Sequence, residues 1–193
     1  MKITVTALLA LLSLSSFYVH AEEGRHVIGV QGGHVGMTQK VGEDYGSALG
    51  YGAFFNYAGS DFLELQLNYL QSKHTRNNLN LDQKVFGISA LYIIDQIDAF
   101  VPYAKGGAEF ISHTQDIENQ TTATTASYNS QAFGLLLGAG TQFLIGSNMM
   151  AGLDFAYHSV FEATTTVGAR NVPTIQSFFT VMLQFGYRFG SGK

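Results

Sequence analysis

The chain has no cysteine among its 193 residues. A disulfide, a thiolate site and a lipid anchor on cysteine are therefore excluded, and this absence is compatible with an oxidising compartment. Charged residues make up only 12% of the chain, about half of the ~25% that is usual for soluble domains. They form no basic stripe, so we expect no nucleic-acid partner.

Long apolar runs are missing after the N-terminal segment. No later segment has the 18 or more consecutive apolar residues that indicate a transmembrane helix. The N-terminal segment has a basic start at Lys2, an apolar run from Val5 to Leu14, and small residues at Val19 and Ala21. This pattern predicts a cleaved secretory signal peptide over residues 1–21. A single domain is expected over residues 22–193.

The chain shows alternation in place of long apolar runs. Every second residue from Phe179 to Phe189 is large and apolar, and the residues between them are mostly small or polar. A period of two is typical of a β-strand with one apolar face. About 9–11 such residues cross a bilayer when the strand is tilted. The segment Ser177–Phe189 therefore predicts a membrane-crossing strand.

Eight segments alternate in this way, and their connections alternate between tight turns and long polar links. This arrangement is typical of outer-membrane barrels. A soluble barrel would need a charged outer face, whereas the less apolar face here is mainly Gly, Ala, Ser, Asn and Gln. We expect an all-β fold, an eight-stranded antiparallel up-and-down transmembrane β-barrel. Its strands are expected at Arg25–Met37, Ser47–Ala58, Asp61–Ser72, Leu81–Ile94, Ala99–His113, Ser130–Phe143, Met149–Val160 and Ser177–Phe189.

The four long links are predicted to be extracellular loops. They cover Thr38–Gly46, Lys73–Asn80, Thr114–Asn129 and Phe161–Gln176. The third is low in complexity, so we expect it to be mobile.

The whole pattern resembles the small OmpA/OmpX-type barrels of the outer-membrane β-barrel-domain group. The local likenesses are Val101-Pro102-Tyr103 followed by Gly106-Gly107, and the ending Gly186-Tyr187-Arg188-Phe189. The resemblance implies a place in the outer membrane of a Gram-negative bacterium, among lipid and lipopolysaccharide. It also implies assembly by the barrel-assembly machinery through the terminal strand, with Phe185, Tyr187 and Phe189. We expect a monomer with no cofactor, and a surface ligand that the sequence does not identify.

The inner face of the predicted barrel carries titratable residues. They are Glu64, Lys105, Glu109, Asp154, His158 and Arg188. Buried charges must be paired or hydrated. Two alternatives stay open: an ion-pair network that plugs the barrel, and the lining of a hydrated channel. A second group at the outer strand ends could contact lipopolysaccharide phosphates; it comprises Lys40, Lys73, His74, Arg76 and Lys84.

An enzyme of the same architecture is the remote alternative. Lipid-A deacylases carry a His and a Ser two residues apart on one strand face. Here His158 and Ser159 are adjacent, so a strand directs them to opposite faces and the serine has no base. The other histidines have no metal-binding spacing, and we predict no catalytic or metal site. The expected function is a non-catalytic structural or adhesion-like role through the loops, with a small-solute channel as the alternative.

Overall fold

A computed structural model describes residues 26–38, 46–76, 79–119, 124–161, 163–167 and 170–190. The predicted signal peptide lies outside these residues. The strands are β1 (His26–Met37), β2 (Ser47–Ala58), β3 (Leu63–Arg76), β4 (Leu79–Ile93), β5 (Phe100–Asn119), β6 (Thr124–Ile145), β7 (Met149–Val160), β8 (Ala163–Val167), β9 (Arg170–Ile175) and β10 (Phe178–Phe189). Over the described part of the chain, no helix has the length and apolar character needed to cross a membrane.

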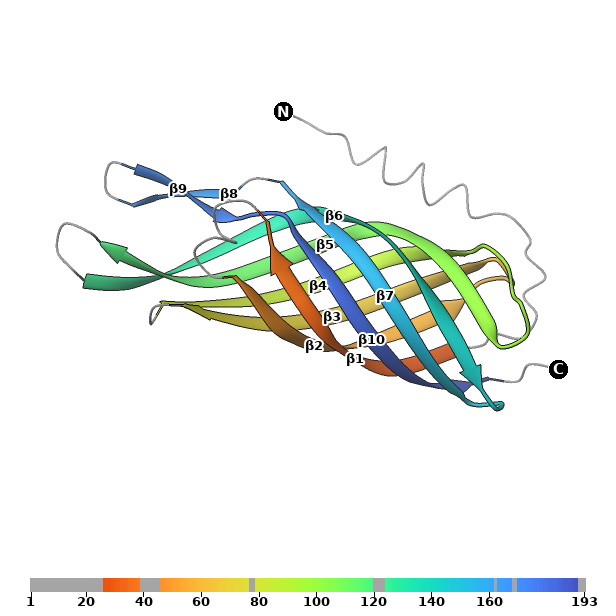
Figure 1. The fold of residues 1–193 in the computed structure, drawn as a ribbon. Helices are drawn as coiled ribbons and strands as arrows, with labels where there is room; N and C mark the ends of the chain where they lie inside the picture. The colour runs from red at the N-terminus through yellow and green to blue at the C-terminus, as the bar shows by residue number, and fades with distance from the viewer. Residues whose placement is uncertain are drawn as a thin grey trace, which may run out of the picture.

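Eight of these strands close into an antiparallel barrel in the order β1-β10-β7-β6-β5-β4-β3-β2 (Figure 1). The first and last strands close it in a register that runs from His26 opposite Phe189 to Met37 opposite Phe178. Each other barrel strand pairs with the barrel strands that precede and follow it in the chain. The predicted eight-stranded antiparallel up-and-down barrel is therefore confirmed.

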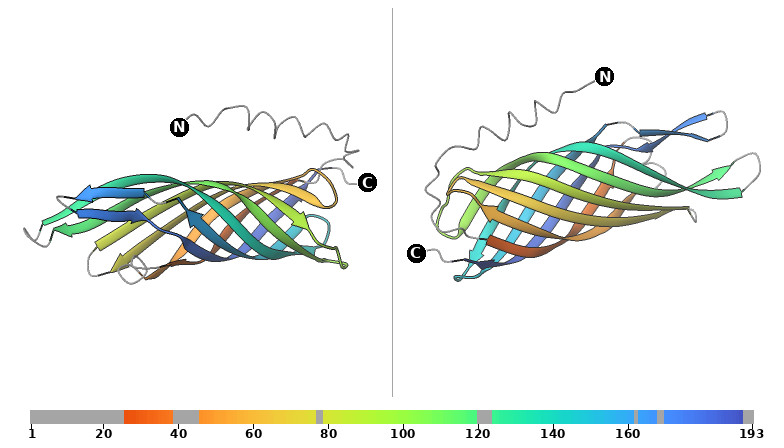
Figure 2. Two further views of the ribbon diagram at one scale, coloured as in Figure 1. Left: turned by 90° about the horizontal axis from the view of Figure 1, so that it is seen from above. Right: turned by 180° about the vertical axis from the view of Figure 1, so that it is seen from behind.

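The two ends of the barrel differ. At one end, here called the turn end, three tight turns join β2 to β3, β4 to β5 and β6 to β7. At the other, the loop end, the β5–β6 hairpin and the separate β8–β9 hairpin project beyond the barrel wall (Figures 1 and 2). The long connections thus lie together at one end, as the alternating lengths predict.

The strands at the loop end are longer than the sequence predicts. Residues expected in loops continue β3 to Arg76, begin β4 at Leu79, extend β5 to Asn119 and begin β6 at Thr124. The fourth expected loop contains β8 and β9. In these extensions both faces carry polar residues, so the apolar–polar alternation disappears from the sequence although backbone pairing continues. Burial still alternates there, since Lys73 and Thr75 are exposed and His74 is buried. The centre of the third expected loop, residues 120–123, lies outside the described residues.

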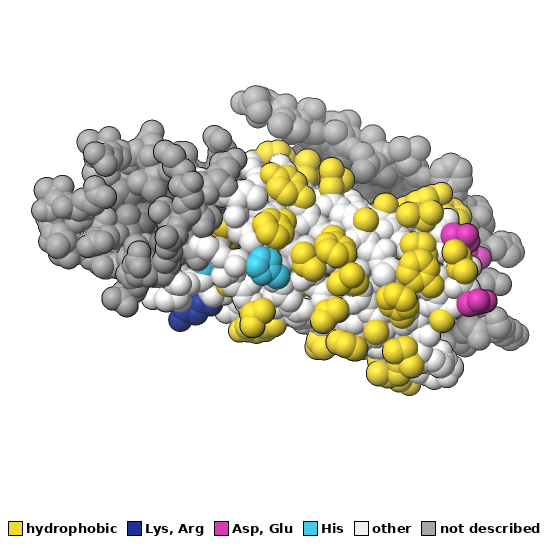
Figure 3. All heavy atoms as spheres, viewed as in Figure 1, with side chains coloured by type: hydrophobic (Ala, Val, Ile, Leu, Met, Phe, Trp, Pro, Cys, Tyr) yellow, Lys and Arg dark blue, Asp and Glu magenta, His cyan; other side chains and the backbone are white. Residues whose placement is uncertain are grey.

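Outward side chains form an apolar wall bounded by two aromatic belts. Apolar side chains cover the visible wall, and the charged side chains visible among the described residues lie toward its ends (Figure 3). On β5 the belts lie ten residues apart, from Phe100 to Phe110. At ~3.3 Å per residue and a tilt of ~45°, this spans about 23 Å. The ring contacts of the loop-end belt are His34–Phe179, Tyr69–Phe86 and Phe110–Phe133; those of the turn-end belt include His26–Tyr57, Phe62–Tyr92 and Phe100–Phe143.

Candidate functional site in the barrel lumen

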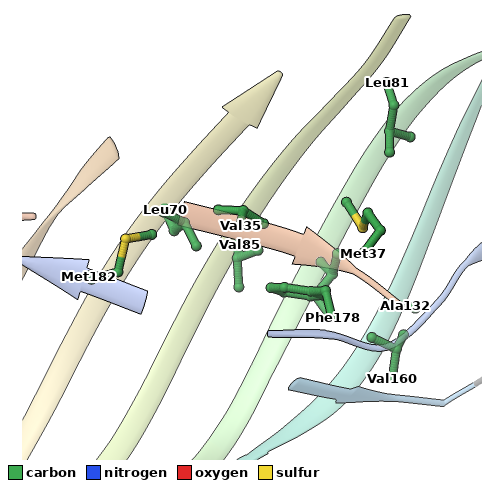
Figure 4. Packing of buried hydrophobic residues seen from close by; sticks show 10 residues of the cluster. Val35, Met37, Leu70, Leu81, Val85, Ala132, Val160, Phe178 and Met182 are labelled. Carbon is green, nitrogen blue, oxygen red and sulfur yellow. The ribbon is translucent and has the colours of Figure 1, made fainter. Parts of the chain in front are cut away.

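An apolar layer of buried side chains lies in the loop-end half of the lumen (Figure 4), where the buried polar side chains of His74, Gln83 and His113 share the inner faces of the same strands. An eight-stranded barrel has an interior just wide enough for side chains, and here several of them leave no surface exposed to solvent. Phe178, Leu81 and Val85 are each 0% exposed. The layer comprises Val35, Met37, Leu70, Leu81, Val85, Ile111, Ala132, Val160, Phe178 and Met182.

The buried side chain of His158 and its contacts lie directly against this layer. The ring of His158 on β7 stacks on Phe178, with centroids 4.1 Å apart and an interplanar angle of 7°. Its Nδ1 lies 2.7 Å from Glu109 Oε2 on β5, and its Nε2 lies 3.1 Å from Thr180 Oγ1 on β10. All these side chains are buried. Contacts among three strands therefore hold the imidazole across the lumen.

A buried ion pair lies further toward the turn end. Lys105 Nζ on β5 donates to Asp154 Oδ1 on β7 at 2.6 Å. The hydroxyl of Tyr103 donates to the other carboxylate oxygen, also at 2.6 Å. The carboxylate of Asp154 thus accepts one charged and one neutral hydrogen bond. Such charge-assisted bonds are the strong ones in a low-dielectric interior.

Glycines on β6 make room for these long side chains. A Cβ added at Gly138 would lie 3.0 Å from Lys105 Cε, and one at Gly140 would lie 2.4 Å from the Tyr103 hydroxyl. The side chains from β5 therefore reach across space that β6 leaves open. The space beside these inner-face glycines is thus occupied by side chains from the neighbouring strand β5.

A polar network around Glu64 lies at the turn end. Its Oε2 accepts hydrogen bonds from Asn56 Nδ2 at 2.9 Å and from Gln142 Nε2 at 3.3 Å. Gln66 in turn donates to Asn56 Oδ1. Arg188 is half-buried at the same end, opposite Val27 of β1. The charged groups of the lumen are therefore distributed over three levels.

The structure places the residues selected from the sequence on the inner face and resolves their partners. Lys105 meets Asp154 and Glu109 meets His158. The partners that the sequence analysis missed are Tyr103 and Thr180. No sequence signal could have found them, because each comes from a strand whose stagger is set by barrel closure.

Two hydroxyl–imidazole contacts also escaped the sequence analysis. His158 and Ser159 do face opposite ways, since His158 is buried and Ser159 is exposed. His158 instead meets the hydroxyl of Thr180. On β3, Ser72 Oγ lies 3.2 Å from His74 Nε2, and His74 Nδ1 lies 3.2 Å from the Gly46 carbonyl oxygen. The Ser-Lys-His spacing of this second pair was visible in the sequence.

Some buried polar atoms have no hydrogen-bond partner among protein atoms. They include both amide atoms of Gln83, the Ser89 hydroxyl, Asn68 Oδ1 and Glu109 Oε1. Buried polar groups in this position are normally satisfied by internal water. The polar part of the lumen is therefore suited to isolated water molecules. Across the described ranges, no group of three or more metal-ligating side chains comes together.

The closed antiparallel barrel, the apolar outer wall with its two aromatic belts, and the buried polar residues of the lumen define an integral β-barrel membrane protein. Residues 4–189 match the family described as outer membrane protein beta-barrel domain. The chain belongs to this family, and its place is the outer membrane of a Gram-negative bacterium.

Solved structures support the same fold at low identity. The Neisserial surface protein A is 15% identical, with a TM-score of 0.59, and the match covers 86% of this chain and 97% of that one. The N-terminal barrel of Pseudomonas aeruginosa OprF is 15% identical over 86% and 97%, with a TM-score of 0.54. A major outer membrane protein of Thermus thermophilus is 11% identical over 86% and 99%, with a TM-score of 0.64. A comparison with curated proteins found no match.

Proposed function

We propose that this protein is a closed, non-catalytic outer-membrane barrel that acts at the cell surface, in a structural or adhesion-like role. The observation that supports this most directly is the apolar layer across the loop-end half of the lumen. Ions do not cross such a layer without water. The loop end then lies outside the cell, where the projecting hairpins meet surface partners.

The paired charges support the same proposal. A channel lining keeps its charges hydrated and available to passing ions. Here Lys105 and Asp154 neutralise each other at 2.6 Å, and their side chains are almost completely buried. Glu109 is likewise engaged by His158. These groups stabilise a filled interior and leave little charge to select an ion.

A catalytic role is not favoured, although two hydroxyl–imidazole pairs exist. Thr180 and Ser72 are only 4% and 1% exposed. Both lie on the inner face, whereas a membrane lipid would reach only the outer wall. A nucleophile must be within reach of its substrate before its base matters. We therefore propose that these pairs are structural.

A small-solute channel remains the second candidate. The observation in its favour is the set of buried polar atoms without protein partners, around Gln83, Ser89 and Glu109. Water at these atoms would form part of a hydrated path. That path conducts only if the apolar layer next to it moves.

The absence of cysteine provides a clean test. A single cysteine is introduced at Gln66, in the polar part of the lumen, and a matched one at Ser47, which is exposed at the loop end. Intact cells are treated with a membrane-impermeant maleimide. A closed barrel leaves Q66C unlabelled and S47C labelled, and heat unfolding then exposes both. Labelling of Q66C in folded protein at a rate near that of S47C would overturn the proposal.

A further inference from the structure

An apolar groove runs across the outer wall of the barrel, on strands β1 to β6. Its volume is ≈ 630 Å³, within the ~300–1,000 Å³ range of ligand pockets. Its floor lies over the small residues Ala53, Gly87 and Ala108. The central strands of this group, β3 to β5, face the viewer in yellow to green in the right-hand view of Figure 2.

One side of the groove is the loop-end aromatic belt. Tyr69 packs against Phe86 with ring centroids 4.8 Å apart, and Phe110 packs against Phe133 at 5.4 Å. These rings rise beside the small floor residues, so the groove reaches the depth at which the belt meets the membrane–water interface. A chain lying in the groove therefore ends close to the headgroup region.

Lysines lie immediately above this side of the groove. Lys84 is exposed and comes two residues above Phe86 on the same outward face of β4. Gln71 lies opposite Lys84, and the exposed Lys73 lies opposite Asp82 one step higher. Asp82 accepts a hydrogen bond from Gln71 at 3.4 Å. Among the described residues, Lys84 is thus the cation next to the groove's upper edge, whereas Lys73 lies near the carboxylates of Asp82 and Asp116.

We infer that this groove, together with Lys84 and Lys73, holds one lipopolysaccharide molecule of the outer leaflet. An acyl chain lies in the groove over Ala53 and Ala108. A phosphate of the headgroup contacts Lys84, with Lys73 above it. The combination of an apolar groove with cations at its upper edge matches a lipid with acyl chains and an anionic headgroup. The inference goes beyond the proposed function and holds whether or not the lumen conducts.

The absence of tryptophan makes the site measurable by fluorescence. One variant carries Phe133→Trp beside the groove. A depth-matched control carries Phe179→Trp, in the same belt on β10. Both are refolded into brominated phosphatidylcholine, whose bromine atoms quench tryptophan, and lipopolysaccharide is titrated in. We expect fluorescence of F133W to recover at a several-fold lower lipopolysaccharide fraction than that of F179W.

Two changes should abolish the preference in the F133W background. Lys84→Gln with Lys73→Gln removes the cations, and Ala108→Phe fills the groove; Ala139→Phe, on the outer wall outside the groove, should leave the preference intact. Equal recovery at both tryptophans would overturn the inference. So would an equal preference for phosphatidylglycerol, since the site would then recognise any anionic lipid.

Discussion

At the residue scale, the stability of the folded barrel depends on buried pairs of charged side chains, and removing one member of a pair leaves the other without its partner. Lys105 and Asp154 come from strands that are not adjacent, and Tyr103 completes the hydrogen bonding of the carboxylate. Removing one partner of a buried pair leaves an uncompensated charge, whereas replacing both with apolar groups is often tolerated. The contribution of the pair is therefore visible only when single and double changes are compared.

Lys105→Met should destabilise the folded barrel by about 3–5 kcal/mol, because Asp154 is left charged in a nearly dry interior. The measurement is urea unfolding of protein refolded in lipid vesicles. Lys105→Met combined with Asp154→Leu should recover most of this loss. If the single variant unfolds like the wild type, Asp154 is hydrated and the lumen is more open than the structure indicates.

Asp116 gives a pH-dependent contact outside the membrane. Hydrogen bonds from Ser127 and from the side chain and backbone of Asn80 hold the pKa of this exposed carboxyl below its usual value. A depressed pKa means that the stabilising contact is complete above the unfolded value, ~3.9, and is lost as pH falls through the folded pKa. Nuclear magnetic resonance of the Asn80 amide should titrate with a midpoint below ~3.9.

The control for this titration is Asp116→Asn, in which the Asn80 amide should show no such transition. A midpoint at or above ~3.9 in the wild type would contradict the assignment, because it would mean that the carboxyl gains nothing from Asn80 and Ser127 in the folded state.

At the element scale, alternation of side chains was sufficient to predict the barrel but not its full height. In β3, Leu63, Leu65 and Leu67 face outward while Gln66 is buried, as the sequence indicates. Within the membrane the two faces meet different solvents, so the period of two is strong. Above it, as at Lys73–Arg76, both faces are polar and the pattern carries no information. Partners across the lumen were unpredictable because they depend on the stagger between strands.

Close approach of strands gives a prediction for two glycines that differ in their surroundings. A Cβ at Gly52 on β2 would lie 1.9 Å from the Tyr69 carbonyl oxygen on β3, whereas one at Gly32 on β1 would meet its nearest neighbour at 3.8 Å. Gly52→Ala should therefore destabilise the barrel by about 1–3 kcal/mol. Gly32→Ala should stay within about 0.5 kcal/mol of the wild type.

Both glycine variants are compared by urea unfolding and by the heat-dependent shift on a detergent gel. Equal stability of the two would contradict the strand contact, since it would show that β2 and β3 move apart without cost. A loss of stability in Gly32→Ala alone would also contradict the account, because it would mean that the close approach lies at β1 and not between β2 and β3.

At the scale of the whole molecule, the protein is a barrel with an apolar outer wall and a lumen filled in layers. The apolar layer lies toward the loop end. Below it lie the Glu109–His158 contact and the Lys105–Asp154 ion pair, and the Glu64 network lies at the turn end. The outer wall meets lipid and the loop end presents hairpins (Figures 1 and 3). From this distribution we expect the outer wall and the hairpins to contact lipids and partners, and the side chains in the lumen to stabilise the fold.

Single-channel conductance of the mature protein in a planar bilayer tests this account most directly. Insertion is first established by the heat-dependent gel shift. A variant with Phe178→Ala and Met182→Ala, which thins the apolar layer, provides the comparison. The account predicts no discrete current steps from the inserted wild type and a measurable leak from the variant. Discrete, salt-dependent steps from the wild type would contradict a closed lumen and establish the channel in its place.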